Sequence, residues 1–209
     1  MFKYLLFDLD NTLYSCCHGL EDKVRCRMRA FTAAFLGISP DEAWRQRMML
    51  AAKYGTNLEW LMGEKGFTAV EDYFAAVHPK DEADSLPADP ELRAFLLGLP
   101  IPKAILTNSP REHSDRILSK LGITDLFTHV FDVRQSGYKG KPRPEAFNRA
   151  LSILGVKAPD VLFIDDNPSY VEGFIALGGA GLLLDENDVH GDYPHPKIRE
   201  LKELVLCKD

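Results

Sequence analysis

The sequence has no long hydrophobic run and no recognisable export signal. Of its 209 residues, 45% are apolar, but no stretch approaches the ~18 uncharged apolar residues that a membrane-spanning helix needs. Asp8 and Asp10 interrupt the apolar N-terminal segment, and no cleavage site of small residues follows it, unlike in a signal peptide. We therefore expect neither a membrane segment nor a membrane partner.

Cysteine motifs are also missing. The four cysteines (Cys16, Cys17, Cys26 and Cys207) form no C-x-x-C pair and no Cys/His quartet, which argues against a structural zinc site. Because no export signal is apparent, reduced thiols and a cytoplasmic location are the simplest expectation.

Positive charge is in the minority. The chain has 25 Lys and Arg against 31 Asp and Glu, and its net charge is −6. Nucleic-acid-binding surfaces select stripes of Lys and Arg for the phosphate backbone, so we expect no nucleic-acid partner. A small phosphorylated ligand held through a metal ion is consistent with this balance. The sequence leaves the oligomeric state open, with a monomer as one option.

Short apolar runs alternate with helical patterns along most of the chain. Continuous apolar runs are typical of parallel strands that are buried on both faces. Repeated strand–helix–strand units over residues 100–185 favour an α/β fold with right-handed crossovers. We expect the strands at residues 3–7, 103–107, 130–133, 161–164 and 182–184.

Two segments have the residues of a helix start. Residues 109–112 combine a Ser cap, a Pro at the first helical position and a Glu two residues later, which predicts a capping box. Gly122 predicts the end of that helix. Asn167 followed by Pro168 predicts a second start of the same kind. The tail around residues 193–199 has no interpretable pattern.

Residues 17–80 break the alternation, because they contain no strand-like run. We expect a helical insertion at residues 16–85, after the first strand, within a core made of residues 1–15 and 86–209. At the aromatic and Met positions of this insertion, cap core is favoured over contact with a ligand. Apolar residues recur there at helical spacing in three groups: Leu20, Val24, Met28, Phe31 and Phe35; Trp44, Met48 and Ala51; Phe67, Val70, Phe74 and Val77.

Polar residues follow three of the expected strands. Residues 8–12 (Asp-Leu-Asp-Asn-Thr) follow the first, residues 107–109 (Thr-Asn-Ser) the second, and residues 165–167 (Asp-Asp-Asn) the fourth. In an open α/β sheet, ligands bind in the crevice beyond the carboxyl ends of the strands. We therefore expect these side chains to converge there.

Four carboxylates in one crevice need a cation. Asp8 and Asp10 lie two residues apart, on one face of an extended backbone, and Asp165 and Asp166 join them. Two unit charges ~4 Å apart repel by ~4 kcal/mol at an effective dielectric constant of ~20. Oxygen ligands favour Mg²⁺ over Zn²⁺, and Mg²⁺ often shares its coordination sphere with a substrate phosphate. Phosphoryl chemistry is therefore indicated.

Three further residues supply what phosphoryl transfer needs. Lys141, in Lys-Pro-Arg-Pro, offers a fixed positive charge, and Thr107 and Asn108 can donate hydrogen bonds to phosphate oxygens. Taken singly, each of these residues is as readily explained by a helix cap or a solvated loop. The catalytic interpretation depends on the whole set, which occurs in order at predicted strand ends.

In that order, residues 8–12, Thr107-Asn108, Lys141 and Asp165-Asp166 resemble motifs I to IV of the haloacid dehalogenase (HAD) superfamily. The resemblance spans about residues 2–185, and the helical insertion stands where that superfamily places an α-helical cap. Residues 7–14, 53–55 and 141–147 resemble the pyrimidine 5′-nucleotidase branch. The resemblance implies a Rossmann-like parallel sheet core with a cap, and a Mg²⁺-dependent phosphatase acting on a small phosphomonoester such as a pyrimidine nucleoside 5′-monophosphate.

The same resemblance implies a role for each residue. Asp8 is the nucleophile that forms an aspartyl phosphate, and Asp10 protonates the leaving alcohol and then deprotonates the hydrolytic water. Thr107 binds the transferred group, and Lys141 neutralises charge on it. Mg²⁺ is bound by Asp8, the backbone carbonyl of Asp10, and Asp166, with Asp165 acting through water or orienting the site.

Three further positions bear on the expected site. Four residues beyond Asp166, where many relatives carry Asp or Asn, this chain has Tyr170, which predicts a water in that place or weaker metal binding. Lys139 rivals Lys141, but only Lys141 precedes Pro-x-Pro. His113 is interpreted as a surface or helix-packing residue.

Other functions use similar residues. A sugar-phosphate phosphatase or a phosphomutase of the same superfamily would share the core. A dehalogenase acting on C–Cl bonds would need neither Asp10 nor Mg²⁺. A non-catalytic, phospho-accepting module such as a receiver domain also uses acidic residues, Thr and Lys around Mg²⁺. It places its acidic pair first and its phosphorylated Asp on a later strand, and its chain is shorter.

Overall fold

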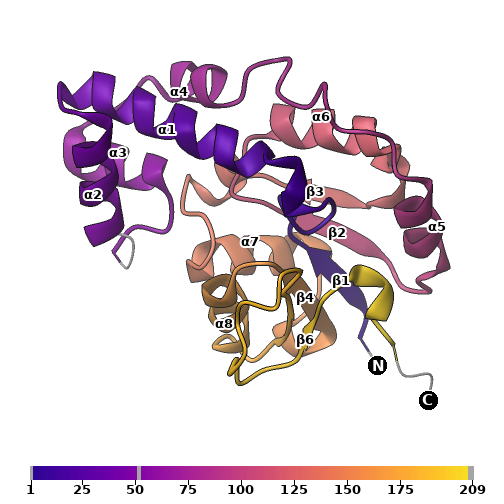
Figure 1. The fold of residues 1–209 in the computed structure, drawn as a ribbon. Helices are drawn as coiled ribbons and strands as arrows, with labels where there is room; N and C mark the ends of the chain where they lie inside the picture. Colours follow the sequence, from indigo (N-terminus) through magenta and orange to yellow (C-terminus); the bar gives the residue numbers. More distant parts are fainter. Residues whose placement is uncertain (1, 51–52, 207–209) are drawn as a thin grey trace.

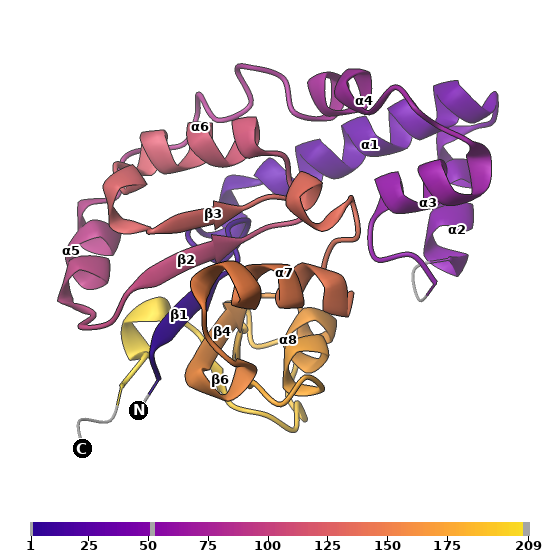
Figure 2. The same cartoon turned by 180° about the vertical axis from the view of Figure 1, so that it is seen from behind.

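The computed structural model describes residues 2–50 and 53–206, which form a parallel sheet with helices on both faces (Figures 1 and 2). In these residues the strand order is β3-β2-β1-β4-β5-β6, and every neighbouring pair is parallel. The predicted α/β class with a Rossmann-like sheet is confirmed. The strands are β1 (Tyr4–Phe7), β2 (Lys103–Leu106), β3 (His129–Phe131), β4 (Val161–Asp165), β5 (Ala180–Leu184) and β6 (Lys197–Ile198).

Side chains that alternate along the strands build two hydrophobic cores. Leu5 and Phe7 of β1 point into one core with α5 and α6, whereas Leu6 points into the other with α7 and α8. Because both faces of the central strands are covered, their sequences are apolar apart from Lys103 at the start of β2 and Asp165 at the end of β4. The helices of the sheet domain are α5 (Pro90–Gly98), α6 (Arg111–Leu121), α7 (Pro144–Leu154) and α8 (Pro168–Ile175).

The five predicted strands are found within two residues of their expected limits. Strand β6 was not expected, because two residues give no apolar run; it pairs with β5, and the Nζ of its Lys197 lies 3.0 Å from Oδ2 of Asp185. Cys207 and Ala51 lie outside the described residues. In the described part, no helix is long and apolar enough to cross a bilayer.

One helix start is as predicted and the other is not. Asn167 caps α8 by accepting a hydrogen bond from Ser169 N, and Gly122 ends α6 in the left-handed conformation. The predicted capping box at residues 109–112 is wrong, because Pro110 is the N-cap and makes no side-chain cap hydrogen bond; the N–H of Arg111 donates to Oδ2 of Asp132 at 3.2 Å instead. The hydroxyl of Ser109 instead donates to Oδ2 of Asp10 at 2.9 Å.

In the described residues between β1 and α5, four α-helices lie between residue 20 and residue 77 and are joined by non-helical segments. They lie beyond one end of the sheet, with the long α1 running out from it (Figure 1). Three of them, α1, α3 and α4, pack around a third hydrophobic core that includes Trp60, which is fully buried and therefore a core residue. The helical position expected for Phe67 is wrong, because this residue lies between α3 and α4. Its ring centroid is 5.6 Å from that of Phe31. The helices are α1 (Leu20–Leu36), α2 (Pro40–Met49), α3 (Asn57–Lys65) and α4 (Val70–Val77).

Candidate active site

Asp8, Lys141 and Asp165 form a buried ion-pair cluster at the carboxyl ends of two adjacent strands. Asp8 follows β1, and Asp165 is the last residue of β4, which pairs with β1. The Nζ of Lys141 lies 2.6 Å from Oδ1 of Asp8 and 2.6 Å from Oδ2 of Asp165. The rival Lys139 is half exposed and pairs with Glu145. Of the two lysines, Lys141 is the one that reaches the cluster.

Asn108 and Thr107 follow β2 and lie beside Lys141. The side-chain amide of Asn108 donates to the Lys141 carbonyl at 3.0 Å and accepts from the Lys141 N–H at 2.6 Å. Asn108 therefore fixes the lysine backbone, a contact that the sequence did not indicate. Thr107 is buried, and its Oγ1 accepts from the N–H of Ser109 at 3.0 Å, which leaves its O–H to donate to a ligand.

Three carboxylates offer the ligands for a metal ion. One oxygen each of Asp8, Asp165 and Asp166 lies within 4.8 Å of the others. Burial and the neighbouring Asp165 raise the pKa of Asp166 to about 8, and burial raises that of Asp8 well above its usual range despite Lys141. One ammonium does not balance three clustered carboxylates, two of them buried and one partly buried. The all-oxygen donor set and its excess of negative charge fit Mg²⁺.

Asp165 and Asp166 differ in what they can offer. Both oxygens of Asp165 already accept hydrogen bonds, Oδ2 from Lys141 and Oδ1 from the N–H of Asn167 at 2.8 Å. Asp165 is fully buried, whereas Asp166 lines the cavity above the cluster.

Tyr170 lies with its ring centroid 5.1 Å from Nζ of Lys141. Burial raises the pKa of Tyr170 to about 12, so it adds no negative charge.

Asp10 accepts hydrogen bonds from three side chains. Its Oδ1 accepts from the Tyr14 hydroxyl at 2.6 Å and contacts Nε2 of His113 at 2.7 Å, and its Oδ2 accepts from Ser109. Burial alone would raise the pKa of Asp10, but the charge and hydrogen bond of His113 outweigh it and hold that pKa well below its usual range. Asp10 is therefore an ionised carboxylate in a fixed orientation.

His113 is not the surface or packing residue that the sequence indicated. It is fully buried on α6, between Asp10 and Glu82. Burial lowers its pKa, but the two carboxylates outweigh that effect and raise it to about 10. Its spacing from Ile117 and Leu121, four and eight residues, places it on the buried face of the helix. The helical spacing that places His113 on the buried face was visible in the sequence. Glu82 lies in an irregular segment, where no such spacing could have indicated its position.

A cavity of about 770 Å³ opens over the carboxylate cluster. Asp8, Asp10, Lys141 and Asp166 line it from the sheet, together with Thr107 and Asn108. Side chains of the α1–α4 region form the opposite wall and include the apolar Val24, Met28, Trp44, Met48 and Phe74. The predicted site residues thus share one cavity, with Asp165 buried next to it.

The loop between α2 and α3 packs directly on the Lys141 loop. A Cβ added at Gly55 would lie 3.0 Å from the carbonyl oxygens of both Gly140 and Lys141, so the two backbones touch. Arg143 adds an ion pair, with its Nη2 3.2 Å from Oε1 of Glu59. These contacts close the cavity on that side.

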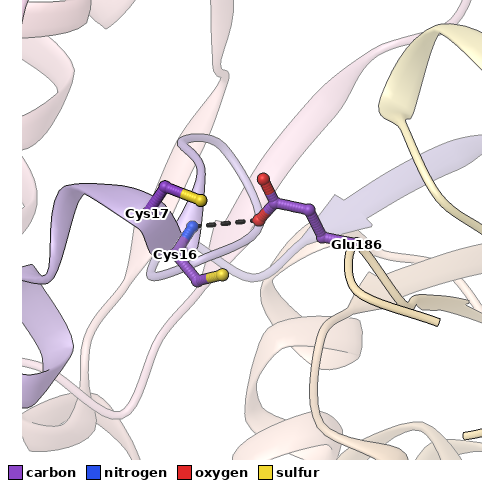
Figure 3. A group of neighbouring side chains, drawn as sticks. All are labelled: Cys16, Cys17 and Glu186. Carbon is purple, nitrogen blue, oxygen red and sulfur yellow. Dashed lines mark hydrogen bonds between the residues drawn. The ribbon is translucent and has the colours of Figure 1, made fainter. Parts of the chain in front are cut away.

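Cys16, Cys17 and Glu186 form a separate group outside the cavity (Figure 3). The carboxylate of Glu186 accepts hydrogen bonds from the Cys16 N–H at 3.0 Å and from the Ser15 hydroxyl. Burial raises the pKa of Cys16 to about 11, so its thiol is protonated at neutral pH and is a poor metal ligand. We interpret the group as an anchor between the loop after β1 and the segment after β5.

Comparisons with known proteins agree with this geometry. A family model described as haloacid dehalogenase-like hydrolase matches residues 2–178. Phosphate metabolism protein 8 of Saccharomyces cerevisiae is 29% identical over 99% of this chain and 73% of its own length. Validoxylamine A 7′-phosphate phosphatase of Streptomyces hygroscopicus subsp. limoneus is 28% identical over 88% of this chain and 84% of its own.

The fold also matches solved structures. β-Phosphoglucomutase from Clostridium difficile superposes with a TM-score of 0.66 at 16% identity, over 98% of this chain and 94% of that one. The family model covers most of the chain and includes the Asp8, Asp10, Lys141 and Asp166 positions. The chain therefore belongs to the haloacid dehalogenase-like hydrolase family.

Proposed function

We propose that this chain is a Mg²⁺-dependent phosphatase that hydrolyses a small phosphomonoester through an aspartyl phosphate on Asp8. The observation that carries the proposal is the buried Asp8 at the base of an open cavity, with Lys141 on Oδ1 and Asp10 beside it. Relatives named as phosphatases for validoxylamine A 7′-phosphate and for glyceraldehyde 3-phosphate support phosphomonoester hydrolysis.

The proposed first step joins Asp8 to phosphorus. A carboxylate oxygen of Asp8 attacks the phosphorus, the bond from phosphorus to the leaving oxygen breaks, and Asp10 gives that oxygen a proton. Lys141 neutralises charge on the transferred group, and hydrogen bonds from Thr107 and Asn108 orient it. Asp10 is ionised in the free protein, and the negative charge of a bound phosphate favours its protonation.

The proposed second step regenerates Asp8. Water attacks the phosphorus, Asp10 takes a proton from that water, and the bond between Asp8 and phosphorus breaks to release phosphate. Mg²⁺, when bound, supplies the charge that offsets the clustered anions. Asp8 and Asp166 are the side chains positioned to hold it, since the oxygens of Asp165 are already engaged. The backbone carbonyl of Asp10 is proposed as its third protein ligand.

We further propose that residues 16–85 form the cap that selects the substrate, over a core of residues 1–15 and 86–209. The cavity volume of about 770 Å³ lies in the range typical of sites for drug-sized ligands. Its apolar wall, with Trp44 and Phe74, suits a flat ring. These features favour a pyrimidine nucleoside 5′-monophosphate over a three-carbon phosphate.

The activity is tested with a substrate panel. We expect phosphate release from UMP or CMP that exceeds release from AMP, FMN, sugar phosphates and p-nitrophenyl phosphate, and we expect EDTA to abolish it and added Mg²⁺ to restore it. Turnover of sugar phosphates alone would support the phosphatase activity and contradict the proposed nucleotide substrate. Phosphoryl return to a sugar without net phosphate release would indicate a mutase. A phosphoenzyme that lasts for minutes without turnover would indicate a phospho-accepting module.

Arg47 on α2 is a candidate specificity residue in the cavity wall. Its Nη2 donates to the Gly55 carbonyl at 3.1 Å, and its Nη1 is buried with no partner. No carboxylate of the described residues lies within 4.0 Å of it, and burial lowers its pKa. Because Arg47 lines the cavity, a rotation of its side chain would let the unpartnered nitrogen donate to a carbonyl or anionic group on the part of the substrate far from the phosphate.

Replacing Arg47 by Met is expected to raise KM for UMP or CMP by about 10-fold or more, the equivalent of a hydrogen bond to a charged group. KM for p-nitrophenyl phosphate, which has no ring carbonyl, should change little. Steady-state kinetics with both substrates measure the difference. Arg45→Met is the matched control, since Arg45 is exposed and pairs with Glu42. An equal rise in KM for both substrates would contradict the assignment.

A further inference from the structure

A chain of buried contacts runs from Asp10 away from the cavity. Nε2 of His113 lies 2.7 Å from Oδ1 of Asp10, and Nδ1 of the same ring lies 2.8 Å from Oε1 of Glu82. His113 has no exposed surface, and Glu82 is 6% exposed. Glu82 follows α4, in the segment that leads from the helical region back to the sheet. One histidine thus connects that segment to the loop after β1.

Glu82 is itself held in place from three directions. Arg116, one turn beyond His113 on α6, donates from Nε and Nη2 to Oε1, with the Nε distance 3.1 Å. His78 contacts Oε2 through Nδ1 at 3.1 Å, and Nη1 of Arg27 lies 3.9 Å from the same oxygen. Neither oxygen of Glu82 is free to turn away from this arrangement.

The same residues do not form a metal site. Nitrogens of His78 and His113 and an oxygen of Glu82 lie close enough to hold an ion. However, the histidine nitrogens that face Glu82 already contact its oxygens, and the guanidinium of Arg116 on Glu82 would repel a cation. The cluster is a support of ion pairs and hydrogen bonds behind Asp10, which His113 joins through its ion pair with Glu82.

The consequence for Asp10 is geometric. A carboxylate has about four lone-pair directions. Two on Oδ1 face Tyr14 and His113, and one on Oδ2 faces Ser109. One direction on Oδ2 is left, and the carboxylate plane cannot rotate without breaking contacts to these three side chains. The free direction belongs to an oxygen whose residue lines the cavity.

We propose that His113, held by Glu82, is a positioning residue that keeps the free lone pair of Asp10 directed at the leaving oxygen of the substrate. This inference rests on the phosphatase activity proposed above and adds to it residues outside the four motifs. His113 does not line the cavity and makes no hydrogen bond or ion pair with Asp8 or Lys141. Its effect reaches the reaction through Asp10 alone.

The test compares two leaving groups. The leaving oxygen of an alkyl phosphate, such as a nucleoside 5′-monophosphate, needs a proton, whereas p-nitrophenolate leaves without one. His113→Leu is expected to lower kcat/KM for the alkyl phosphate by about 100-fold, the low end for general acid–base catalysis, and kcat/KM for p-nitrophenyl phosphate by much less. The comparison uses kcat/KM because it reports the steps up to departure of the leaving group, whereas the second step, which also uses Asp10, is common to both substrates. His113→Gln, whose amide can reach Asp10 from the same position, should recover part of the loss.

Two further variants keep the result interpretable. Glu82→Gln is expected to shift the ratio of the two kcat/KM values in the same direction as His113→Leu, by a smaller factor. It tests the positioning proposal if His113→Leu does not fold. His129→Gln is the control, because His129 is exposed on β3 and its loss should leave the ratio unchanged. Circular dichroism and thermal unfolding report the folding of each variant.

Each outcome answers a different question. Equal losses for both substrates in the His113 and Glu82 variants would assign the cluster a merely structural role, and unchanged rates would remove any role in the reaction; both overturn the positioning proposal. A wild-type protein that hydrolyses no phosphomonoester at all would instead overturn the proposed function. Selective loss for the alkyl phosphate supports the proposal.

Discussion

Asp8→Asn is expected to reduce Mg²⁺-dependent turnover by at least about 10⁴-fold, as loss of a nucleophile typically does, while the protein stays folded. Asn has almost the same shape as Asp, and its Oδ1 can still accept from Nζ of Lys141. The substitution also removes one of the mutually repelling carboxylates that, together with burial, raise the pKa of Asp8. We therefore expect an unfolding temperature equal to or higher than that of the wild type.

Two measurements make this expectation specific. Phosphate release from the best substrate of the panel gives the rate, and an acid-quenched single turnover tests for a phosphoenzyme that hydroxylamine cleaves, as it cleaves acyl phosphates. The wild type should form this species and Asp8→Asn should not. Asp84→Asn is the control, since Asp84 is an exposed residue paired with Lys120. Full turnover by Asp8→Asn would remove Asp8 as the nucleophile.

The sheet was predictable because burial on both faces leaves a strong local signal. Strands β1, β2 and β4 are apolar apart from Lys103 at the start of β2 and Asp165 at the end of β4, and all their residues apart from the partly exposed Tyr4 are buried. Strand β6 left no such signal, because it is two residues long and partly exposed. The capping box failed for a different reason. The local sequence predicts a hydrogen bond between Ser109 and the backbone of the helix that follows. In the folded chain the Ser109 hydroxyl donates to the carboxylate of Asp10 instead.

The site residues also differ in whether a local sequence signal marked them. Asp8, Lys141 and Asp166 lie in sequence motifs with recognisable order, and the structure brings them to one cavity. Glu82 could not be assigned from sequence, because its contact with His113 depends on how an irregular segment returns to the sheet. His113 lay within reach of prediction, since it occupies the buried face of α6. A polar residue on such a face must have a partner, and the sequence did not show which.

Lys141→Met is expected to destabilise the protein strongly. Lys141 is 1% exposed and is the ammonium between Asp8 and Asp165. Its removal leaves three clustered carboxylates without a paired charge, and breaking a buried pair in this way costs about 3–5 kcal/mol of unfolding free energy. Urea unfolding in EDTA measures the loss. Lys139→Met, which removes an exposed lysine two residues away, should change stability by less than about 1 kcal/mol.

Acid and Mg²⁺ should each restore part of the stability that Lys141→Met loses. The pKa of Asp166 is raised to about 8 by burial and Asp165, and loss of the ammonium favours still more protonation of the cluster. A carboxyl whose folded pKa exceeds its unfolded pKa binds protons on folding, so stability rises as the pH falls below the folded value. In EDTA, the variant should therefore be closer to wild type at pH 6 than at pH 8.5. Mg²⁺ should narrow the gap at pH 8.5, since it binds the folded cluster. A gap that neither acid nor Mg²⁺ changes would mean that Lys141 stabilises the fold by packing rather than by charge.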